Sequence, residues 1–168
     1  MRISIARTDD ADALSAVARA TFLQSFATDV GWPDIALRAA REDSPDAFRA
    51  RMADGATCWL ARVAATDAPV GFAMLCAPEL PVDTEPTDTE LKRIYVLHRF
   101  HGHGLGARLL EAAEDHAHDS GRTRLLLGVK DDNPSVAWYR RRGFATVGTR
   151  RFRVGENWFD DLVMAKPL

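Results

Sequence analysis

The chain has 168 residues, 46% of them hydrophobic and 27% charged, which excludes a disordered or fibrous protein and is enough for one domain with a sizeable core. The formal net charge is only −2, and no apolar run approaches the length of a membrane span, so we expect neither a nucleic-acid nor a membrane partner. The first residues, "MRISIARTDD", lack the apolar core of a secretion signal, and we expect a cytoplasmic protein.

The chain is predicted to begin with a strand followed by three helices. Residues 2–6 alternate between polar and apolar side chains, as in a half-buried strand. Thr8, Asp9 and Asp10 can cap a helix whose apolar positions continue to Phe26. The next two helices are expected over 33–41 and from Ser44-Pro45 to Asp54, the second ended by Gly55.

Three strands follow, over 57–64, 69–77 and 89–97, and a short turn at 66–68 joins the first two into a hairpin. Cys58 and Cys76 are the two cysteines of the chain, and both lie in these strands. We expect buried, reduced thiols, with a disulfide across the hairpin as the alternative.

The last third of the chain is predicted to contain two helices and three strands. A helix follows the glycine-rich residues 100–106 and ends near Ser120 at Gly121, and a short helix runs from Pro134 to Gly143. The strands are expected over 124–129, 146–154 and 157–166. Residues 1–168 therefore form a single α/β domain (α+β in some schemes) of order βααα-βββ-α-β-α-ββ, a mixed sheet with helices on both faces.

The segment "FHGHGLGARLL" (100–110) places three glycines directly before a helix. A strand, a glycine-rich turn and a helix N-terminus together make an anion site, because the first N–H groups of a helix have no internal partner. No lysine follows as a P-loop requires, and the spacing G-x-G-x-G differs from the G-x-G-x-x-G of dinucleotide sites.

Residues 101–106 resemble the pyrophosphate loop R/Q-x-x-G-x-G/A of the GNAT superfamily of acyl-CoA-dependent N-acyltransferases, with His101 where Arg or Gln is usual. The segment "NPSVAWYRRRGF" (133–144) is similar to the N-x-x-A…Y-x-x-x-GF segment of that family. The end segments "TFLQSF" and "GENWFDDLVMAKPL" resemble a bacterial branch near the polyamine acetyltransferases. The resemblance implies the GNAT fold, with a mostly antiparallel sheet and acetyl-CoA as co-substrate.

The resemblance also implies roles for individual residues. Tyr139 would give a proton to the leaving thiolate, Asn133 would contact the pantetheine arm, and Arg142 or a neighbour would meet an outer phosphate. A backbone N–H near Ile94, Tyr95 or Val96 would bind the thioester oxygen. The pyrophosphate would lie on the backbone of His101, Gly102, His103, Gly104, Leu105 and Gly106. The alternatives are a packing role for Tyr139, a helix-cap role for Asn133 and solvation for Arg142.

Glu90, at the start of the third predicted strand, is the candidate general base. An amine must be neutral to attack a thioester, and deprotonating a lysine-like amine near neutral pH costs about 4 kcal/mol. A carboxylate can take that proton directly or through water. The alternative is a solvated carboxylate at a strand end.

All five histidines lie between positions 98 and 118. Zinc requires three or four converging ligands on a rigid frame, which a glycine-rich loop does not provide. We therefore expect no metal site.

Charge is spread unevenly along the sequence. Residues 122–153 carry nine basic residues and two acidic ones, whereas residues 76–90 carry five acids and no base. One region would face an anion and the other a cation, although an ordinary solvated surface is the alternative for each charge.

These observations predict an acetyl-CoA-dependent N-acetyltransferase of a primary amine. The acids of 76–90 and Glu156 favour a small cationic amine such as a polyamine. A protein or peptide amine remains an alternative, and so does a non-catalytic CoA-binding sensor, which the unusual His101 favours. A homodimer is left open.

Overall fold

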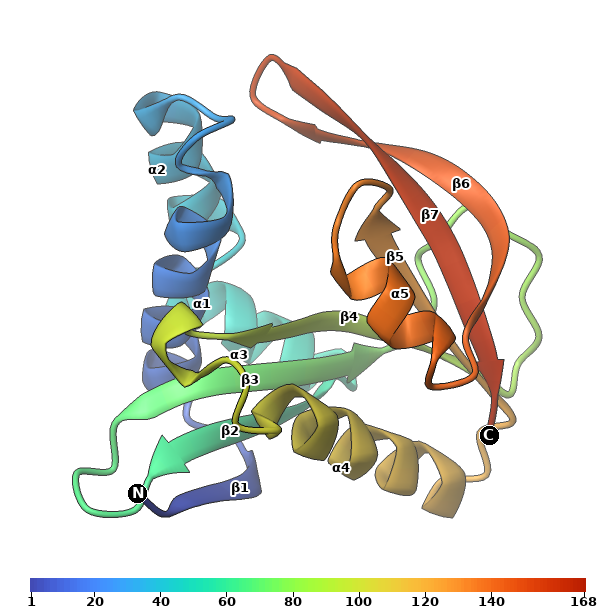
Figure 1. The fold of residues 1–168 in the computed structure, drawn as a ribbon, viewed down its shortest axis with the longest axis horizontal. Helices are drawn as coiled ribbons and strands as arrows, with labels where there is room; N and C mark the ends of the chain where they lie inside the picture. Colours follow the sequence, from blue (N-terminus) through green and yellow to red (C-terminus); the bar gives the residue numbers. More distant parts are fainter.

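The computed structural model describes all residues 1–168 and contains one sheet of order β1-β2-β3-β4-β5-β7-β6 (Figure 1). Every pair of neighbouring strands is antiparallel except β4 and β5, which are parallel. The predicted mixed, mostly antiparallel sheet is confirmed. The strands are β1 Ile3–Thr8, β2 Thr57–Val63, β3 Pro69–Cys76, β4 Asp88–Val96, β5 Arg124–Lys130, β6 Ala145–Val154 and β7 Asn157–Pro167.

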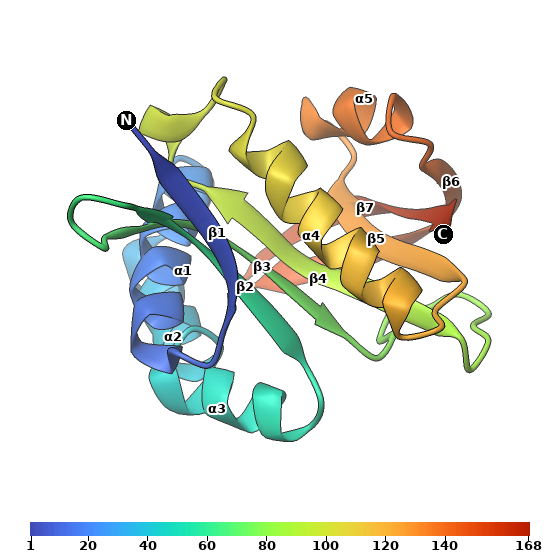
Figure 2. The ribbon, with the colours of Figure 1, turned by 90° about the horizontal axis from the view of Figure 1, so that it is seen from below.

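Helices cover both faces of the sheet, as predicted. One face carries α1 Ala11–Phe26, α2 Trp32–Arg41 and α3 Pro45–Ala53. The other carries α4 Leu105–Asp119 and α5 Ser135–Arg140, which lie in front of the sheet in Figure 2. A short 3₁₀ helix, η1 His98–Phe100, precedes α4 and has no counterpart in the sequence prediction.

The alternation of side chains along β2 and β3 supplies both hydrophobic cores. Leu60 and Phe72 pack with α1 and α3 in one buried cluster, whereas their neighbours Ala61 and Ala73 pack under α4 in the larger cluster. Successive side chains of a strand point to opposite faces, so two short apolar strands suffice to anchor helices on both sides.

Local signals in the sequence set the helix ends. The side chain of Asp10 accepts a hydrogen bond from Ala13 N at 3.0 Å, and that of Ser44 accepts one from Ala47 N at 3.1 Å, as expected of N-cap residues. Gly55 and Gly121 follow α3 and α4 with φ of 97° and 73°, a left-handed conformation that favours glycine.

The two cysteines are free, so the alternative of a cross-hairpin disulfide is wrong. Cys58 lies opposite Met74 and Cys76 opposite Glu90, which leaves the two thiols unpaired in the sheet register. Cys58 is buried and Cys76 is half-buried. Burial raises the pKa of Cys58 to about 11, and burial followed by the charge of Glu90 raises the pKa of Cys76 to about 12.

The sheet opens between β4 and β5. These strands pair only from Asp88 to Glu90, opposite Arg124 to Leu126, and then diverge (Figure 1). A bulge at Lys92 accompanies the divergence, since Leu75 pairs with Leu91 and Met74 with Arg93, and bulges bend a strand away from its neighbour.

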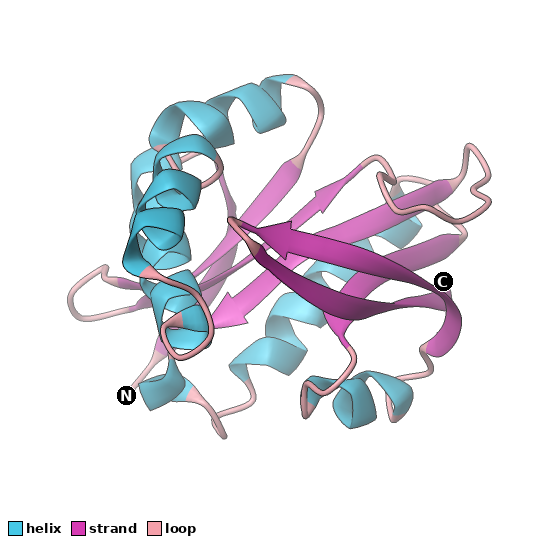
Figure 3. Ribbon diagram, turned by 90° about the horizontal axis from the view of Figure 1, so that it is seen from above, coloured by secondary structure: helices cyan, strands magenta, loops and turns pink.

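The hairpin of β6 and β7 reaches back over the sheet to α2. Its tip and α2 stand on the same side of the sheet in Figures 1 and 3. Val154 of β6 is buried in a small cluster with Phe22, Val30 and Ile35. None of the helices combines the length and the apolar character that crossing a bilayer requires.

Candidate active site

A cleft of about 1290 Å³ occupies the opening between β4 and β5. Leu91–Val96 of β4 form one wall and Leu127–Lys130 of β5 form the other. Residues from both faces of the sheet line the cleft, so it runs through the sheet. We call its two ends the α4 mouth (the 102–107 loop except His103, with Asn133, Trp138, Tyr139 and Arg142) and the α2 mouth (Arg38, Glu42, Arg93, Arg150, Phe152 and Asp161).

The backbone of residues 102–107 forms the floor of the α4 mouth. None of its six N–H groups has a backbone or side-chain partner in the chain, and the first internal bond of α4 is Arg108 N to Gly104 O at 3.1 Å. Gly102 and Gly104 have φ of 77° and 73°, and a Cβ added at either would meet nothing within 4 Å. Successive free N–H groups at a helix N-terminus form a binding site for phosphate.

The two histidines of the loop turn back onto the chain. His101 Nε2 lies 2.7 Å from Val96 O and donates to it, so the ring rests on the end of β4. His103 Nδ1 lies 2.9 Å from His101 O. No group of three His, Cys, Asp or Glu side chains converges in the chain to hold a metal ion.

The backbone of β4 presents alternate N–H groups to the cleft. Leu97 N donates to Val70 O at 2.9 Å, and hydrogen-bonded pairs alternate along an antiparallel ladder. Since Tyr95 lies opposite Phe72, the N–H of Tyr95 points to β3, whereas those of Ile94 and Val96 point to the opening. Of the three N–H groups predicted as donors to the thioester oxygen, those of Ile94 and Val96 therefore face the cleft, and that of Tyr95 does not.

Tyr139 lines the α4 mouth from the last turn of α5. Its ring packs edge-on against Trp138 and Phe144, with centroid separations of 4.9 and 5.5 Å, and the residue is only 7% exposed. Its hydroxyl makes no hydrogen bond within the chain. Burial raises the pKa of Tyr139 above its usual value, so the hydroxyl keeps its proton at neutral pH.

Asn133 and Arg142 also line the cleft. Asn133 Oδ1 accepts a hydrogen bond from Ser135 N at 2.8 Å, just before α5, whose N-cap residue is Pro134, and the amide N–H groups of Asn133 remain available. Arg142 lies over the ring of Trp138 with Cζ 3.9 Å from the centroid. Trp138 in turn approaches Gly106, where an added Cβ would lie 3.8 Å from Cζ2.

Glu90 does not line the cleft. Its side chain is 2% exposed, Oε2 accepts from Glu79 N at 2.6 Å, and Oε1 lies 3.4 Å from Lys92 Nζ. The alternative of a solvated carboxylate is therefore wrong, and the structure does not bring Glu90 to the other predicted site residues.

Arg122 and Arg124 of the basic segment contact the acidic segment, whereas four other basic residues line the cleft: Lys130, Arg142, Arg150 and Arg153. Arg124 donates to Asp88 Oδ1 at 3.0 Å and to Asp83 O at 2.9 Å, and its hydrogen bond holds the pKa of Asp88 below its usual range. Only Glu79 of the acidic segment lines the cleft. Glu156 pairs with Arg153 at 3.1 Å and lies outside it.

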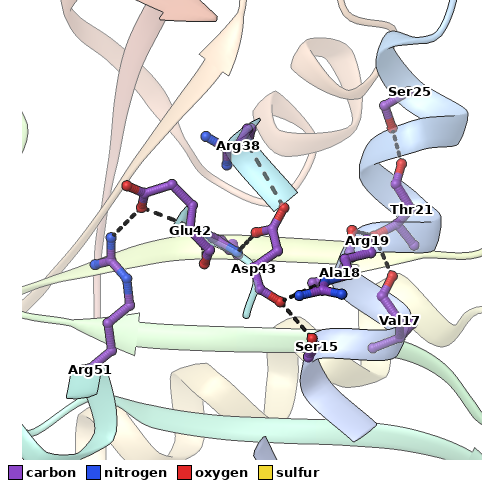
Figure 4. Close-up of polar contacts among 11 residues, drawn as sticks. Ser15, Val17, Ala18, Arg19, Thr21, Ser25, Arg38, Glu42, Asp43 and Arg51 are labelled. Atoms are coloured by element: carbon purple, nitrogen blue, oxygen red, sulfur yellow. Dashed lines mark hydrogen bonds and ion pairs between the residues drawn. The ribbon is translucent and has the colours of Figure 1, made fainter. Parts of the chain in front are cut away.

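The α2 mouth contains a buried ionic network that the sequence analysis missed (Figure 4). Arg93 Nη1 lies 2.5 Å from Asp43 Oδ1, and Arg93 Nη2 donates to Glu42 O at 3.2 Å. Asp43 O accepts from Ser15 Oγ at 2.6 Å. No local signal singles out Arg93, because β4 also carries Asp88, Glu90 and Lys92.

Comparisons with known proteins agree with this geometry. A model of the acetyltransferase (GNAT) family matches residues 19–144. The chain is 36% identical over 100 residues to an uncharacterized N-acetyltransferase of Mycobacterium tuberculosis, a match that spans 59% of this chain and only 60% of that relative.

Two solved structures align with this chain over its full length and over their own full length. The PaiA N-acetyltransferase of Thermoplasma acidophilum in complex with coenzyme A has a TM-score of 0.80 at 20% identity. The ribosomal-protein-alanine N-acetyltransferase of Brucella melitensis has a TM-score of 0.71 at 26% identity.

Proposed function

The chain belongs to the GNAT acetyltransferase family, and from this premise we propose that it transfers an acetyl group from acetyl-CoA to a primary amine. One observation carries the proposal. The free N–H groups of 102–107 and the unbonded hydroxyl of Tyr139 line the same mouth of a single cleft. The coenzyme A held by the Thermoplasma structure supports the choice of ligand.

The residues of the α4 mouth suit coenzyme A. The N–H groups of 102–107 would bind its pyrophosphate, with Arg142 beside them for a further phosphate. The amide of Asn133 and the free N–H groups of Ile94 and Val96 would bind the amide-containing pantetheine arm. When bound, acetyl-CoA supplies an acyl group activated as a thioester.

The reaction forms a C–N bond between the amine and the acetyl carbon and breaks the C–S bond. The N–H of Ile94 or Val96 would stabilise the carbonyl oxygen as it becomes negative. The Tyr139 hydroxyl would give its proton to the leaving sulfur, and the amine nitrogen loses a proton. Glu90 stays a sequence prediction for that last step, since it reaches the cleft only through its contacts with Glu79 and Lys92.

A thiol-release assay with acetyl-CoA across a panel of primary amines tests the proposal. The panel includes polyamines, amino acids and peptides with a free N-terminus. Release that depends on an amine, with the N-acetyl product identified by mass spectrometry, is the expected result.

A CoA-binding sensor is the second candidate, and His101 at the first loop position favours it. Tight CoA binding without turnover of any amine would favour the sensor over the enzyme as the function of this chain. The segments "TFLQSF" and "GENWFDDLVMAKPL" favour a polyamine acceptor. The acidic residues expected to attract a polyamine lie outside the cleft, apart from Glu79.

A further inference from the structure

Two arginines of the α2 mouth flank one aromatic ring. Arg38 comes from α2 and Arg150 from β6, and the Cζ atom of each lies 5.6 Å from the centroid of Phe152. Both line the cleft, on the face of the sheet opposite the 102–107 loop. Two guanidinium groups thus lie next to the same apolar ring, and that of Arg38 also lies 4.4 Å from the centroid of Phe22.

Arg38 has no hydrogen bond in the chain. Its Nε is buried without a partner, and the carboxylate oxygen it pairs with, Asp43 Oδ2, is 4.0 Å away. Asp43 is itself engaged by Arg93. The terminal nitrogens of Arg38 point away from Asp43 (Figure 4). Burial and then the charge of Arg93 lower the pKa of Arg38, so an anion beside this group would relieve an unfavourable charge.

Arg150 is positioned by a glycine and an aspartate. Its Nε donates to Asp161 Oδ2 at 2.9 Å, while its terminal nitrogens have no other partner. The guanidinium lies flat on Gly128 of β5, where an added Cβ would be 2.8 Å from Nη2. Any other residue at 128 would displace the guanidinium from this wall of the cleft.

The remaining charges of the α2 side are mostly satisfied. Arg51 and Lys92 pair with Glu79, at 3.5 and 2.7 Å, and Arg51 also pairs with Glu42 at 3.0 Å. Across the whole cleft, nine basic residues face five acidic ones. The lining therefore carries an excess of positive charge, which disfavours a polycation.

We propose that the acceptor amine carries an anionic group, a carboxylate or a phosphate, that binds between Arg38 and Arg150 while its carbon chain contacts Phe152. The proposal rests on the proposed acetyltransferase function and replaces the polyamine expectation. Guanidinium groups bind carboxylates and phosphates through paired N–H donors. The position opposite the loop assigns the two arginines to the acceptor rather than to the phosphates of coenzyme A.

Matched amines test the charge preference. The short amines are β-alanine, propylamine, diaminopropane and phosphoethanolamine. The longer amines are aminohexanoate, hexylamine and diaminohexane. Alanine is also compared with alaninamide. We expect kcat/KM for an anionic member to exceed that of its neutral and cationic counterparts by at least tenfold. β-Alanine against phosphoethanolamine separates carboxylate from phosphate.

Variants locate the preference in the structure. Arg38→Gln and Arg150→Gln should each remove most of the ratio between anionic and neutral amines, whereas Arg151→Gln, on the next residue of β6 and outside the cleft, should keep it. The ratio is unaffected by a general loss of folded enzyme. If Arg150→Gln fails to fold because Asp161 loses its partner, Arg150→Lys replaces it, and a reduced ratio is still expected.

Preference for a diamine, or a ratio unchanged in both variants, would overturn the proposal. If no amine is acetylated, calorimetry with β-alanine, phosphoethanolamine and aminohexanoate is done on the protein saturated with CoA. Binding that Arg38→Gln abolishes supports the anion site while the enzyme proposal fails. No binding of any of the three overturns both.

Discussion

Tyr139 is held rigidly in the cleft with a hydroxyl that keeps its proton at neutral pH. Its ring is fixed between Trp138 and Phe144, its hydroxyl is free of partners in the chain, and burial raises its pKa. The ring orientation therefore does not depend on the hydroxyl, and removing the hydroxyl should affect chemistry without disturbing the packing.

Tyr139→Phe is expected to lower kcat by about a hundredfold or more, in the range of general-acid contributions, with little change in CoA affinity. Single-turnover kinetics and calorimetry measure the two quantities. An unchanged chemical step would remove Tyr139 from proton transfer and leave it a packing residue.

The raised thiol pKa values predict low reactivity of both cysteines in the folded protein. Only the thiolate is nucleophilic, so Cys58 and Cys76, with pKa values of about 11 and about 12, should be alkylated by iodoacetamide at pH 8 at least a hundredfold more slowly than in the unfolded chain. The unfolded chain deprotonates first, near a pKa of about 8.5. Stability from these thiols is thus complete below that pH and is lost as pH rises toward the folded values. Equal rates in the folded and denatured protein would contradict both pKa values.

At the residue scale, motif spacing singled out the loop, Asn133, Tyr139 and Arg142, which all line the cleft, because a motif is recognised from residues close in the chain. It did not locate Arg38, Asp43 or Arg150. The partners of these residues are distant in sequence, as with the 50 positions between Asp43 and Arg93. Local pattern carries no information about such contacts.

The loop before α4 owes its geometry to glycines with left-handed backbone. Gly104 and Gly121, at opposite ends of α4, share a φ of 73°, and a Cβ added at either would meet nothing within 4 Å. The two positions therefore carry the same conformational penalty for a side chain, and only Gly104 lies in the cleft.

Gly104→Ala should weaken CoA binding at least tenfold, because the methyl group would point into the space where the phosphates approach the backbone. Gly121→Ala is the matched control, with a similar loss of thermal stability and unchanged CoA affinity. Equal CoA affinity in both variants, measured by calorimetry, would place the pyrophosphate elsewhere.

At the element scale, the sequence predicted every strand and helix in order except η1. Capping residues, glycines at helix ends and the alternation of apolar and polar side chains are local signals, and the elements were predicted from them. The separation of β4 from β5 could not be predicted, since it depends on where a parallel pair, joined only through η1 and α4, stops pairing. The same limit explains why Glu90 was expected in the cleft, although it is the last residue of β4 that pairs with β5.

The buried pair of Arg93 and Asp43 links the α2–α3 connection to β4, in addition to the hydrophobic cluster that packs α1 and α3 on the sheet. Arg93 belongs to β4, Asp43 lies between α2 and α3, and Ser15 of α1 bonds to the same aspartate. Asp43 is 1% exposed and Arg93 is 8% exposed. Removing one partner would leave the other charge uncompensated in the interior.

Asp43→Asn should lower the free energy of unfolding by about 3 kcal/mol, the usual cost of breaking a buried ion pair. Asp160→Asn is the control, because Asp160 pairs with Arg151 at 3.8 Å with both side chains mostly exposed, and it should change stability little. Urea denaturation measures both variants. A similar small effect for both would show that solvent screens the Arg93–Asp43 pair.

The short pairing of β4 with β5 also bears on how the molecule unfolds. Three residue pairs join these central strands, whereas seven join β5 to β7 and nine join β6 to β7. Side-chain packing beneath α4, where Leu91 and Leu127 share one core, and the ion pair of Asp88 with Arg124 therefore couple the two halves of the sheet. A molecule bound in the cleft between β4 and β5 would connect the two strands where they make no hydrogen bonds to each other. Its binding free energy would then stabilise the contact between the two halves of the sheet. Unfolding would become more cooperative and would shift to higher temperature.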